Sequence, residues 1–250
     1  MDRLVYTSLS AMRSLMQRQA VTANNLANAN TTGFRGDLAS TQAVYLGSGN
    51  DAISARADAS AVNTTSDMKG AADVATGRDL DVAMDGDALL GVQAQDGGEG
   101  YTRRGDLQLT DSGLLTTGDG YPVLGDSGPI TLPPADKVTI DKTGVIWIVP
   151  QGGDPANPVQ VGHLKLVSAT GSQIAKGEDG LFHVAGGGTL PSDPNARVTS
   201  GALEGSNVNV TEALTAMIEA ARAWETQVKM LNGAKDMDSA TTQLMNISDN

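Results

Sequence analysis

The glycines and prolines of this chain are confined almost entirely to its middle. Residues 37–205 hold 27 of the 30 glycines and all nine prolines, whereas residues 1–32 contain neither and residues 206–250 contain only Gly233. Because glycine and proline interrupt helices more strongly than other residues, long helices are favoured only at the two ends. The distribution therefore predicts an α+β fold, with long N- and C-terminal helices around a turn-rich centre.

Apolar residues at spacings of three and four mark one face of each predicted helix. In the N-terminal stretch they are Val5, Leu9, Met12, Met16, Ala23 and Leu26. In the C-terminal stretch they are Leu214, Met217, Ala221, Trp224, Val228 and Leu231, and after an irregular interval around Lys235 the pattern resumes at Met237, Thr241 and Leu244. Such stripes are typical of helices that pack through a coiled-coil-like seam. Gly33 is expected to end the first helix and Asn209 to cap the second. Helices with one apolar stripe need partners that cover it.

The centre shows the pattern of an all-β domain. Short β-prone runs, among them Leu107–Leu109, Val138–Ile140, Val145–Val149 and His163–Val167, are separated by turns containing glycine, and no helical interval lies between them. Residues 47–78 are rich in Ser, Ala, Asp, Asn and Thr, which favours an extended connector. The predicted division is a helical arm at 1–35, a connector at 36–78, a β domain at 79–205 and a second helical arm at 206–250.

Composition argues against several classes of function. The chain has no cysteine and a net charge of −12, so thiolate chemistry is excluded and nucleic acid and anionic lipid surfaces are disfavoured as partners. No stretch approaches the ~20 apolar residues that span a bilayer, and residues 1–30 lack the apolar core of a secretory signal. His163 and His183 lie in strand-like runs and are interpreted as ordinary strand residues. We therefore expect no catalytic residues, no metal, no cofactor and no small-molecule substrate.

Two local patterns leave alternatives open. Asp79, Asp81, Asp85 and Asp87 could supply oxygen ligands to calcium, but Ala83 stands where an EF-hand series needs a ligand. Solvated carboxylates at turns and strand ends are the preferred interpretation. Arg-Gly-Asp occurs at 35–37 and at 104–106, and turn chemistry or chance explains such a short string better than adhesion.

The end of the first helix is unusually rich in asparagine. Asn24, Asn25, Asn28 and Asn30 precede Thr31-Thr32-Gly33-Phe34-Arg35. Asparagine is a poor helix former, so the cluster indicates either a fraying helix end, with amides bonded to the backbone, or amides that fix the register of a helical interface. The second hypothesis makes Asn24, Asn25, Asn28, Thr32, Gly33 and Phe34 candidates for an assembly interface, together with Val5, Leu9, Met12, Met16 and Leu26 on the first helix and Leu214, Met217, Ala221, Trp224, Val228, Leu231 and Leu244 on the second.

The string ANNLANANTTGFR at 23–35 resembles the N-terminal motif of the flagellar rod and hook family. The opening MDRLVYTSLSAM, the central YTRRGDLQLTDSGLLTTGDGYPVLGDSGPITLP at 101–133 and LEGSNVNVTEALTAMIEAARAWETQVKM at 203–230 extend the resemblance to both ends and most of the middle, and it is strongest to proximal-rod members. One departure lies at 85–92, where family members usually carry an aromatic pair and this chain has Leu89-Leu90. That loss puts the local packing of the β domain in question.

The resemblance implies a structural subunit of the flagellar basal body and not an enzyme. It implies export through the flagellum-specific type III apparatus without a cleavable signal peptide, and assembly in the periplasm with copies of itself and with other rod subunits. It also implies that the N- and C-terminal helices join into one inner domain that lines the rod, while the β domain faces outward. A distal rod or hook position is the alternative within the family, and a secreted calcium-binding or carbohydrate-processing β protein is the alternative outside it.

Overall fold

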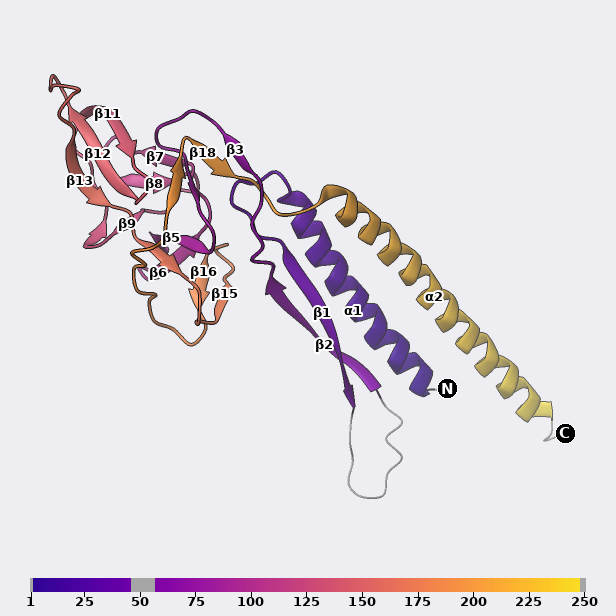
Figure 1. The fold of residues 1–250 in the computed structure, drawn as a ribbon. Coiled ribbons are helices and arrows are strands. Elements are labelled where there is room, and N and C mark those ends of the chain that lie inside the picture. Colours follow the sequence, from indigo (N-terminus) through magenta and orange to yellow (C-terminus); the bar gives the residue numbers. More distant parts are fainter. Residues whose placement is uncertain (1, 46–56, 248–250) are drawn as a thin grey trace. The chain divides into compact units, whose positions relative to one another are not determined.

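The computed structural model describes residues 2–45 and 57–247, and the chain divides into two compact units. The arm unit comprises Met1–Ala27, Asp37–Thr65 and Val208–Asn250, and the β unit comprises Asn28–Gly36 and Ser66–Asn207. The chain therefore passes between the units four times. At the level of class, two terminal helices with a strand-rich centre confirm the predicted α+β fold (Figure 1).

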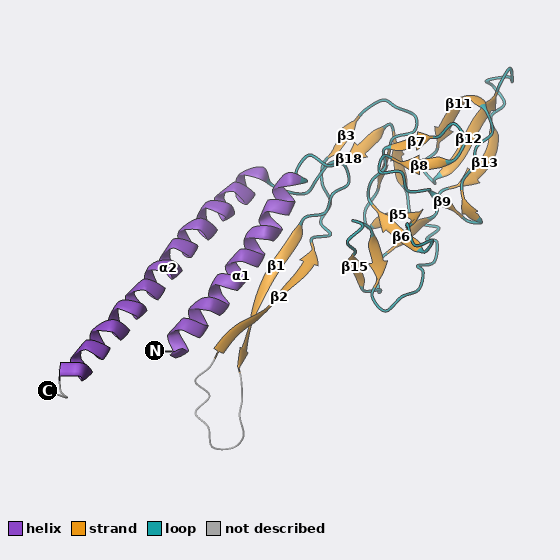
Figure 2. Cartoon of the chain, turned by 180° about the vertical axis from the view of Figure 1, so that it is seen from behind, coloured by secondary structure: helices purple, strands orange, loops and turns teal. Residues whose placement is uncertain are grey.

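The arm unit is built from the two helices and one pair of strands. Helix α1 spans Asp2–Ala27 and helix α2 spans Val210–Ile247, and the two run side by side in opposite directions (Figures 1 and 2). Asn209 caps α2 as predicted, because its side-chain oxygen accepts from the backbone N–H groups of Thr211 at 3.0 Å and Glu212 at 3.3 Å. Helix α1 ends at Ala27, six residues before Gly33, the residue expected to end it.

Strands β1 (Asp37–Tyr45) and β2 (Ala57–Ser66) pair inside the segment that the sequence analysis describes as a connector. Neither strand contains glycine or proline, and β1 packs on α1, with Ser14 Oγ 3.1 Å from Thr41 Oγ1. Packing against a helix can stabilise a strand pair whose low hydrophobicity gives no clear strand signal in the sequence, because β-propensity depends on context. The part of the proposed connector at 46–56 lies outside the described residues.

The β unit consists of short antiparallel strands. One sheet has five strands in the order β14-β5-β6-β16-β15, another has three in the order β11-β12-β13, and four pairs join β3 with β18, β4 with β17, β7 with β8 and β9 with β10. The strands are β3 (Asp73–Ala75), β4 (Val82–Met84), β5 (Ala88–Gln93), β6 (Glu99–Thr102), β7 (Leu107–Leu109), β8 (Leu115–Thr117), β9 (Leu124–Gly125), β10 (Gly128–Pro129), β11 (Ala135–Ile140), β12 (Val145–Pro150), β13 (Val159–His163), β14 (Leu166–Ser168), β15 (Ile174–Lys176), β16 (Phe182–Val184), β17 (Val198–Ser200) and β18 (Ala202–Glu204).

Strand β5 contributes to two hydrophobic clusters. Leu90 is fully buried in a large cluster with residues such as Leu107 and Ile146, and Leu89 is fully buried in a smaller cluster with Tyr101 and Phe182. Successive strand residues point to opposite faces, so the two leucines fill the two sides of the sheet. The packing questioned for lack of an aromatic pair is therefore complete with leucine at both positions.

Candidate assembly interface

About half of the large apolar side chains described on the arm helices are exposed in the single chain. Among the described residues, thirteen large hydrophobic side chains are exposed, and nine of them lie on α1 or α2. They are Val5, Tyr6, Leu9 and Met16 on α1 and Val210, Leu214, Ile218, Met230 and Met237 on α2. Large apolar side chains gathered on two helices and left in contact with water mark a surface that other molecules can cover.

Small side chains occupy the buried positions of the same helices. Ser8 and Ser14 are the buried residues described on α1, and Ala213 and Ala234 are those described on α2. The predicted interface residues Met12, Leu26, Met217, Trp224, Val228 and Leu231 are half-buried, and Ala221 is exposed. The side chain of Leu244 lies outside the described residues. The structure therefore brings part of the predicted stripe into the arm unit and leaves Val5, Leu9, Met16 and Leu214 outward.

The asparagines at the end of α1 bond within the chain. Asn25 Nδ2 donates to the carbonyl of Asp37 and Asn25 Oδ1 accepts from the Asp37 N–H, each at 2.8 Å, so this amide fastens the end of α1 to the start of β1. Asn28 Oδ1 accepts from the Thr31 hydroxyl at 3.2 Å, and Asn28 O accepts from the Thr31 N–H at 3.1 Å. Asn24 is exposed. Of these two amides, that of Asn25 bonds to the backbone, which is what the first interpretation of this cluster expects.

Residues 32–35 dock on the β unit. Gly33 is buried with φ of +68°, its N–H donates to Glu204 O at 2.8 Å, and a Cβ atom there would lie 2.5 Å from the Arg103 carbonyl. Phe34 is half-buried, and Lys176 Nζ lies 3.9 Å from its ring centroid. Thr32 is half-buried in the preceding turn. Glycine is needed at position 33 because of the close backbone approach and the positive φ, and not as a helix cap.

A buried charge cluster holds this docked segment. Glu204 Oε1 accepts from Arg35 Nη2 at 2.6 Å and from the Ala71 N–H at 2.8 Å, while Glu204 Oε2 accepts from Arg103 Nε at 2.6 Å. Arg103 also donates to the carbonyl oxygens of Met84 and Ala88. None of the three charged side chains is more than 4% exposed.

The charges of the cluster do not balance, because two arginines share one carboxylate. Burial lowers the pKa of Arg103, and the Glu204 charge opposes that shift. Nε and Nη1 of Arg35 are buried with no hydrogen-bond partner among the described residues. Burial, followed by repulsion from Glu204, raises the pKa of Asp73, which faces Glu204 across the β3–β18 pair. The cluster is thus held together by Glu204.

The remaining polar candidates are engaged inside the β unit. Arg104 pairs with Asp106 at 2.6 Å and with Asp119 at 2.5 Å, and Arg35 is buried, so both Arg-Gly-Asp strings serve the fold. Asp81 is only 1% exposed and accepts from Thr76 Oγ1 at 2.6 Å, which corrects its interpretation as a solvated carboxylate. Within residues 2–45 and 57–247, no group of three or more His, Asp or Glu side chains could hold a metal ion.

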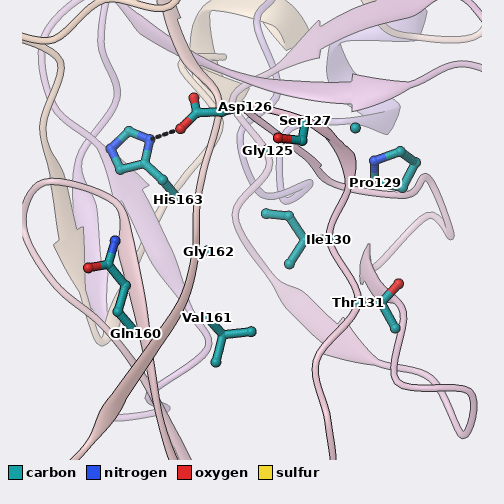
Figure 3. Close-up of a pocket in the computed structure, with 11 residues that line it drawn as sticks. Gly125, Asp126, Ser127, Pro129, Ile130, Thr131, Gln160, Val161, Gly162 and His163 are labelled. Atoms are coloured by element: carbon teal, nitrogen blue, oxygen red, sulfur yellow. Dashed lines mark ion pairs between the residues drawn. The ribbon is translucent and has the colours of Figure 1, made fainter.

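One pocket of about 600 Å³ is lined by residues 125–131 and 160–163 (Figure 3). His163 Nε2 lies 2.9 Å from Thr143 O, and its Nδ1 lies 3.8 Å from Asp126 Oδ2. His183, the second histidine, bonds to Asp179 at 2.9 Å. The pocket lining also includes the hydroxyl side chains of Ser127 and Thr131, and the hydrogen bonds described for His163 reach neither of them. None of the described helices has the length and apolar character needed to cross a bilayer.

Comparison with known proteins assigns the chain to a family. The family model for the flagella basal body rod protein matches residues 5–35, that for the flagellar hook protein FlgE/F/G D1 domain matches 83–148, and that for the flagellar basal body rod FlgEFG protein C-terminal region matches 199–244. The flagellar basal-body rod protein FlgF of Escherichia coli (strain K12) is 42% identical over 255 residues, covering 99% of this chain and all of that protein. The chain belongs to the flagellar basal-body rod protein family.

Two further relatives show the range of the likeness. The FlgF protein of Salmonella typhimurium (strain LT2) is 41% identical, covering 99% of this chain and all of that protein, and the FlgG protein of Bacillus subtilis (strain 168) is 30% identical over 99% of both chains.

Each member of the charge cluster falls in a different family model, with Arg35 in the first, Arg103 in the second and Glu204 in the third. The three regions by which rod proteins are recognised therefore meet at one buried carboxylate. Pairs separated by 101 and 169 residues leave no local pattern, so sequence reasoning missed them.

Proposed function

We propose that this chain is a structural subunit of the proximal flagellar rod, assembling through its terminal helices with copies of itself and with other rod subunits. The observation that carries the proposal is the placement of nine exposed large apolar side chains on α1 and α2 in a member of the rod family. In the proposed assembly these side chains pack in a coiled-coil-like seam between subunits. Burying a single leucine or methionine contributes ~1.5–3 kcal/mol, so a seam of several such residues is a strong adhesive.

The proposed subunit carries load and catalyses no reaction. It takes part in transmitting torque across the periplasm, needs no metal or cofactor, and is exported by the flagellar type III apparatus without a cleavable signal peptide. The names of the FlgF relatives support the rod position. A different place within the rod or hook is the alternative, because FlgG of Bacillus subtilis aligns over the whole chain at 30% identity.

The test substitutes one exposed leucine of the proposed seam. Leu214→Asp puts a carboxylate in place of a side chain that is 47% exposed, in the second turn of α2, near the helix N-terminus where a negative charge is tolerated. Helix and β unit should fold, while burial of an unpaired carboxylate in the seam should block assembly. We expect a strain carrying only this variant to be non-motile, with basal bodies that stop before the complete rod.

Val159→Asp is the matched control. Val159 is 51% exposed on strand β13 of the β unit, so the same chemical change removes a similar apolar surface away from the helices. Cells with this variant should swim. Circular dichroism of both purified variants should match the unsubstituted chain, which separates assembly from folding. Normal rods and motility with Leu214→Asp would refute the proposed seam.

A further inference from the structure

Asn207 is the last residue of the β unit before the chain enters the arm unit. We propose that its side chain is a clasp that ties together the points at which the chain passes between the units, so that load on the helices reaches the β unit through all passages at once. This inference rests on the proposed function, since it concerns how a rod subunit carries force. The passages follow Ala27, Gly36, Thr65 and Asn207.

The hydrogen bonds of Asn207 reach two other passages. Asn207 Oδ1 accepts from the Gly36 N–H at 2.8 Å, and Asn207 Nδ2 donates to Asp67 O at 2.8 Å and to Lys69 O at 3.1 Å. The Asp67 N–H in turn donates to Gly36 O at 2.7 Å. One half-buried carboxamide thus joins the passage after Gly36, the passage after Thr65 and its own.

Only a carboxamide fits this set of partners. One neighbour is an N–H donor and two are carbonyl acceptors, and a carboxamide offers an acceptor oxygen and two N–H donors on one planar group. These partners also fix the orientation of the amide, because the opposite one would face N–H against N–H. Aspartate has the same shape but presents oxygen to the carbonyls of Asp67 and Lys69, so it keeps one bond and loses two.

The first passage is tied to the same short segment. After α1 ends at Ala27, Gly33 N–H donates to Glu204 O, the Arg35 side chain binds the Glu204 carboxylate, and Phe34 O accepts from Asn207 N at 3.3 Å. Residues 204–207 therefore hold the segment that follows α1 and lead directly to Asn209, the cap of α2. Within the β unit, the segment that follows α1 is thus bound by the four residues that precede α2.

The clasp changes how the four chain passages share a mechanical load. Single hydrogen bonds contribute only ~0.5–1.5 kcal/mol, and segments held by one or two of them open locally in thermal motion. Chain passages that are loaded one at a time yield in succession, whereas passages tied side by side share the force. The clasp makes the four passages one attachment, and that matters most when the subunit works against a high load.

The test uses Asn207→Asp with Asn209→Asp as its matched control. Both changes convert asparagine to aspartate within three residues, but position 209 is a helix N-cap, where aspartate serves as well as asparagine. In hydrogen exchange of the purified full-length chain, the amide of Asp67, whose passage loses both bonds from the side chain at 207, should exchange at least tenfold faster in Asn207→Asp and at the original rate in Asn209→Asp, while the Gly36 amide keeps its acceptor oxygen. Asn207→Ser, which keeps a smaller donor and acceptor, should lie between them and serves where the aspartate variant fails to fold.

Motility under load supplies the second readout. Cells with Asn207→Asp or Asn207→Ser should assemble rods and swim in dilute medium but lose swimming speed more steeply than Asn209→Asp cells as viscosity rises. Unchanged exchange at Asp67 overturns the clasp. Faster exchange with an unchanged response to viscosity overturns its mechanical role. Because exchange is measured on the isolated chain, it tests the clasp even if the Leu214→Asp experiment refutes the rod assembly.

Discussion

Replacing Glu204 by glutamine tests how much the buried charge cluster contributes to stability. Glu204 is 1% exposed and accepts three hydrogen bonds, from Arg35, Arg103 and the Ala71 N–H. Glutamine keeps the size of the side chain but removes the negative charge and turns one acceptor into a donor that faces a guanidinium or an amide N–H. Two arginines then remain buried without the carboxylate that binds both of them, and only the exposed Asp73 carboxylate lies nearby, a change that costs ~3–5 kcal/mol.

A loss of that size is a large fraction of the ~5–15 kcal/mol by which a domain is stable. For a unit of this length it corresponds to a fall of about 6–20 °C in the thermal midpoint. The assay is denaturant and thermal unfolding of the full chain followed by circular dichroism, with Glu178→Gln as control. Glu178 is exposed, so its substitution should change the free energy of unfolding by less than ~0.5 kcal/mol.

The sign of the net charge gives a sharper comparison. Removing the Glu204 charge leaves two buried arginines without their shared carboxylate, whereas Arg35→Met leaves one arginine with that carboxylate and also removes two buried nitrogens, Nε and Nη1, that lack hydrogen-bond partners. Arg35→Met should therefore destabilise the chain less than Glu204→Gln. If Glu204→Gln lowers the free energy of unfolding by less than ~1 kcal/mol, or by less than Arg35→Met, the reasoning about a carboxylate-centred cluster is wrong.

Two further predictions concern the same unit. Gly33→Ala should lower the free energy of unfolding by ~1–3 kcal/mol or more in denaturant unfolding, because the added Cβ would meet the Arg103 backbone. Gly77→Ala, with φ of +74° and open space around it, should lower it clearly less. Equal losses would contradict the argument from close approach. Burial raises the pKa of Tyr101 to about 12. Between pH 10 and 12 this tyrosine therefore ionises in the unfolded chain and stays protonated in the folded chain, so the free energy of unfolding should fall by ~3 kcal/mol as the pH rises through that window. Tyr101→Phe should lack this part of the slope when unfolding is measured across the same pH range.

Much of the fold could be predicted from local sequence signals. The run Leu107–Leu109 is strand β7, Val145–Val149 lies in β12, and the turn glycines Gly113 and Gly144 have the positive φ that tight turns require. These features depend on neighbouring residues, so a single sequence contains them. The cap of α2 at Asn209 is of the same kind.

The features that the sequence analysis missed depend on contacts between distant residues. Strands β1 and β2 are stabilised by pairing and by α1, and the run His163–Val167 divides between β13 and β14 because its two ends pair with different strands. Gly33 belongs to the motif at 23–35, but glycine is needed there because the Arg103 backbone, 70 positions away in the chain, lies against it. The charge cluster has the same cause, since nothing near Glu204 in the chain indicates two arginine partners.

On the arm helices the fully buried side chains are small and several large apolar ones are exposed, which explains why the predicted stripe is only partly buried. A helix in an ordinary globular domain buries its large apolar residues and exposes small or polar ones. Here Ser14 and Ala213 are buried while Met16 and Leu214 are exposed, so the arm unit uses its small side chains internally. Periodicity identifies which residues share a face of a helix, but it does not tell whether that face meets the same chain or a neighbour. Because contacts between small side chains bury little apolar area, the arms gain limited stability within one chain, and in the proposed assembly packing between subunits supplies much of what holds them in place.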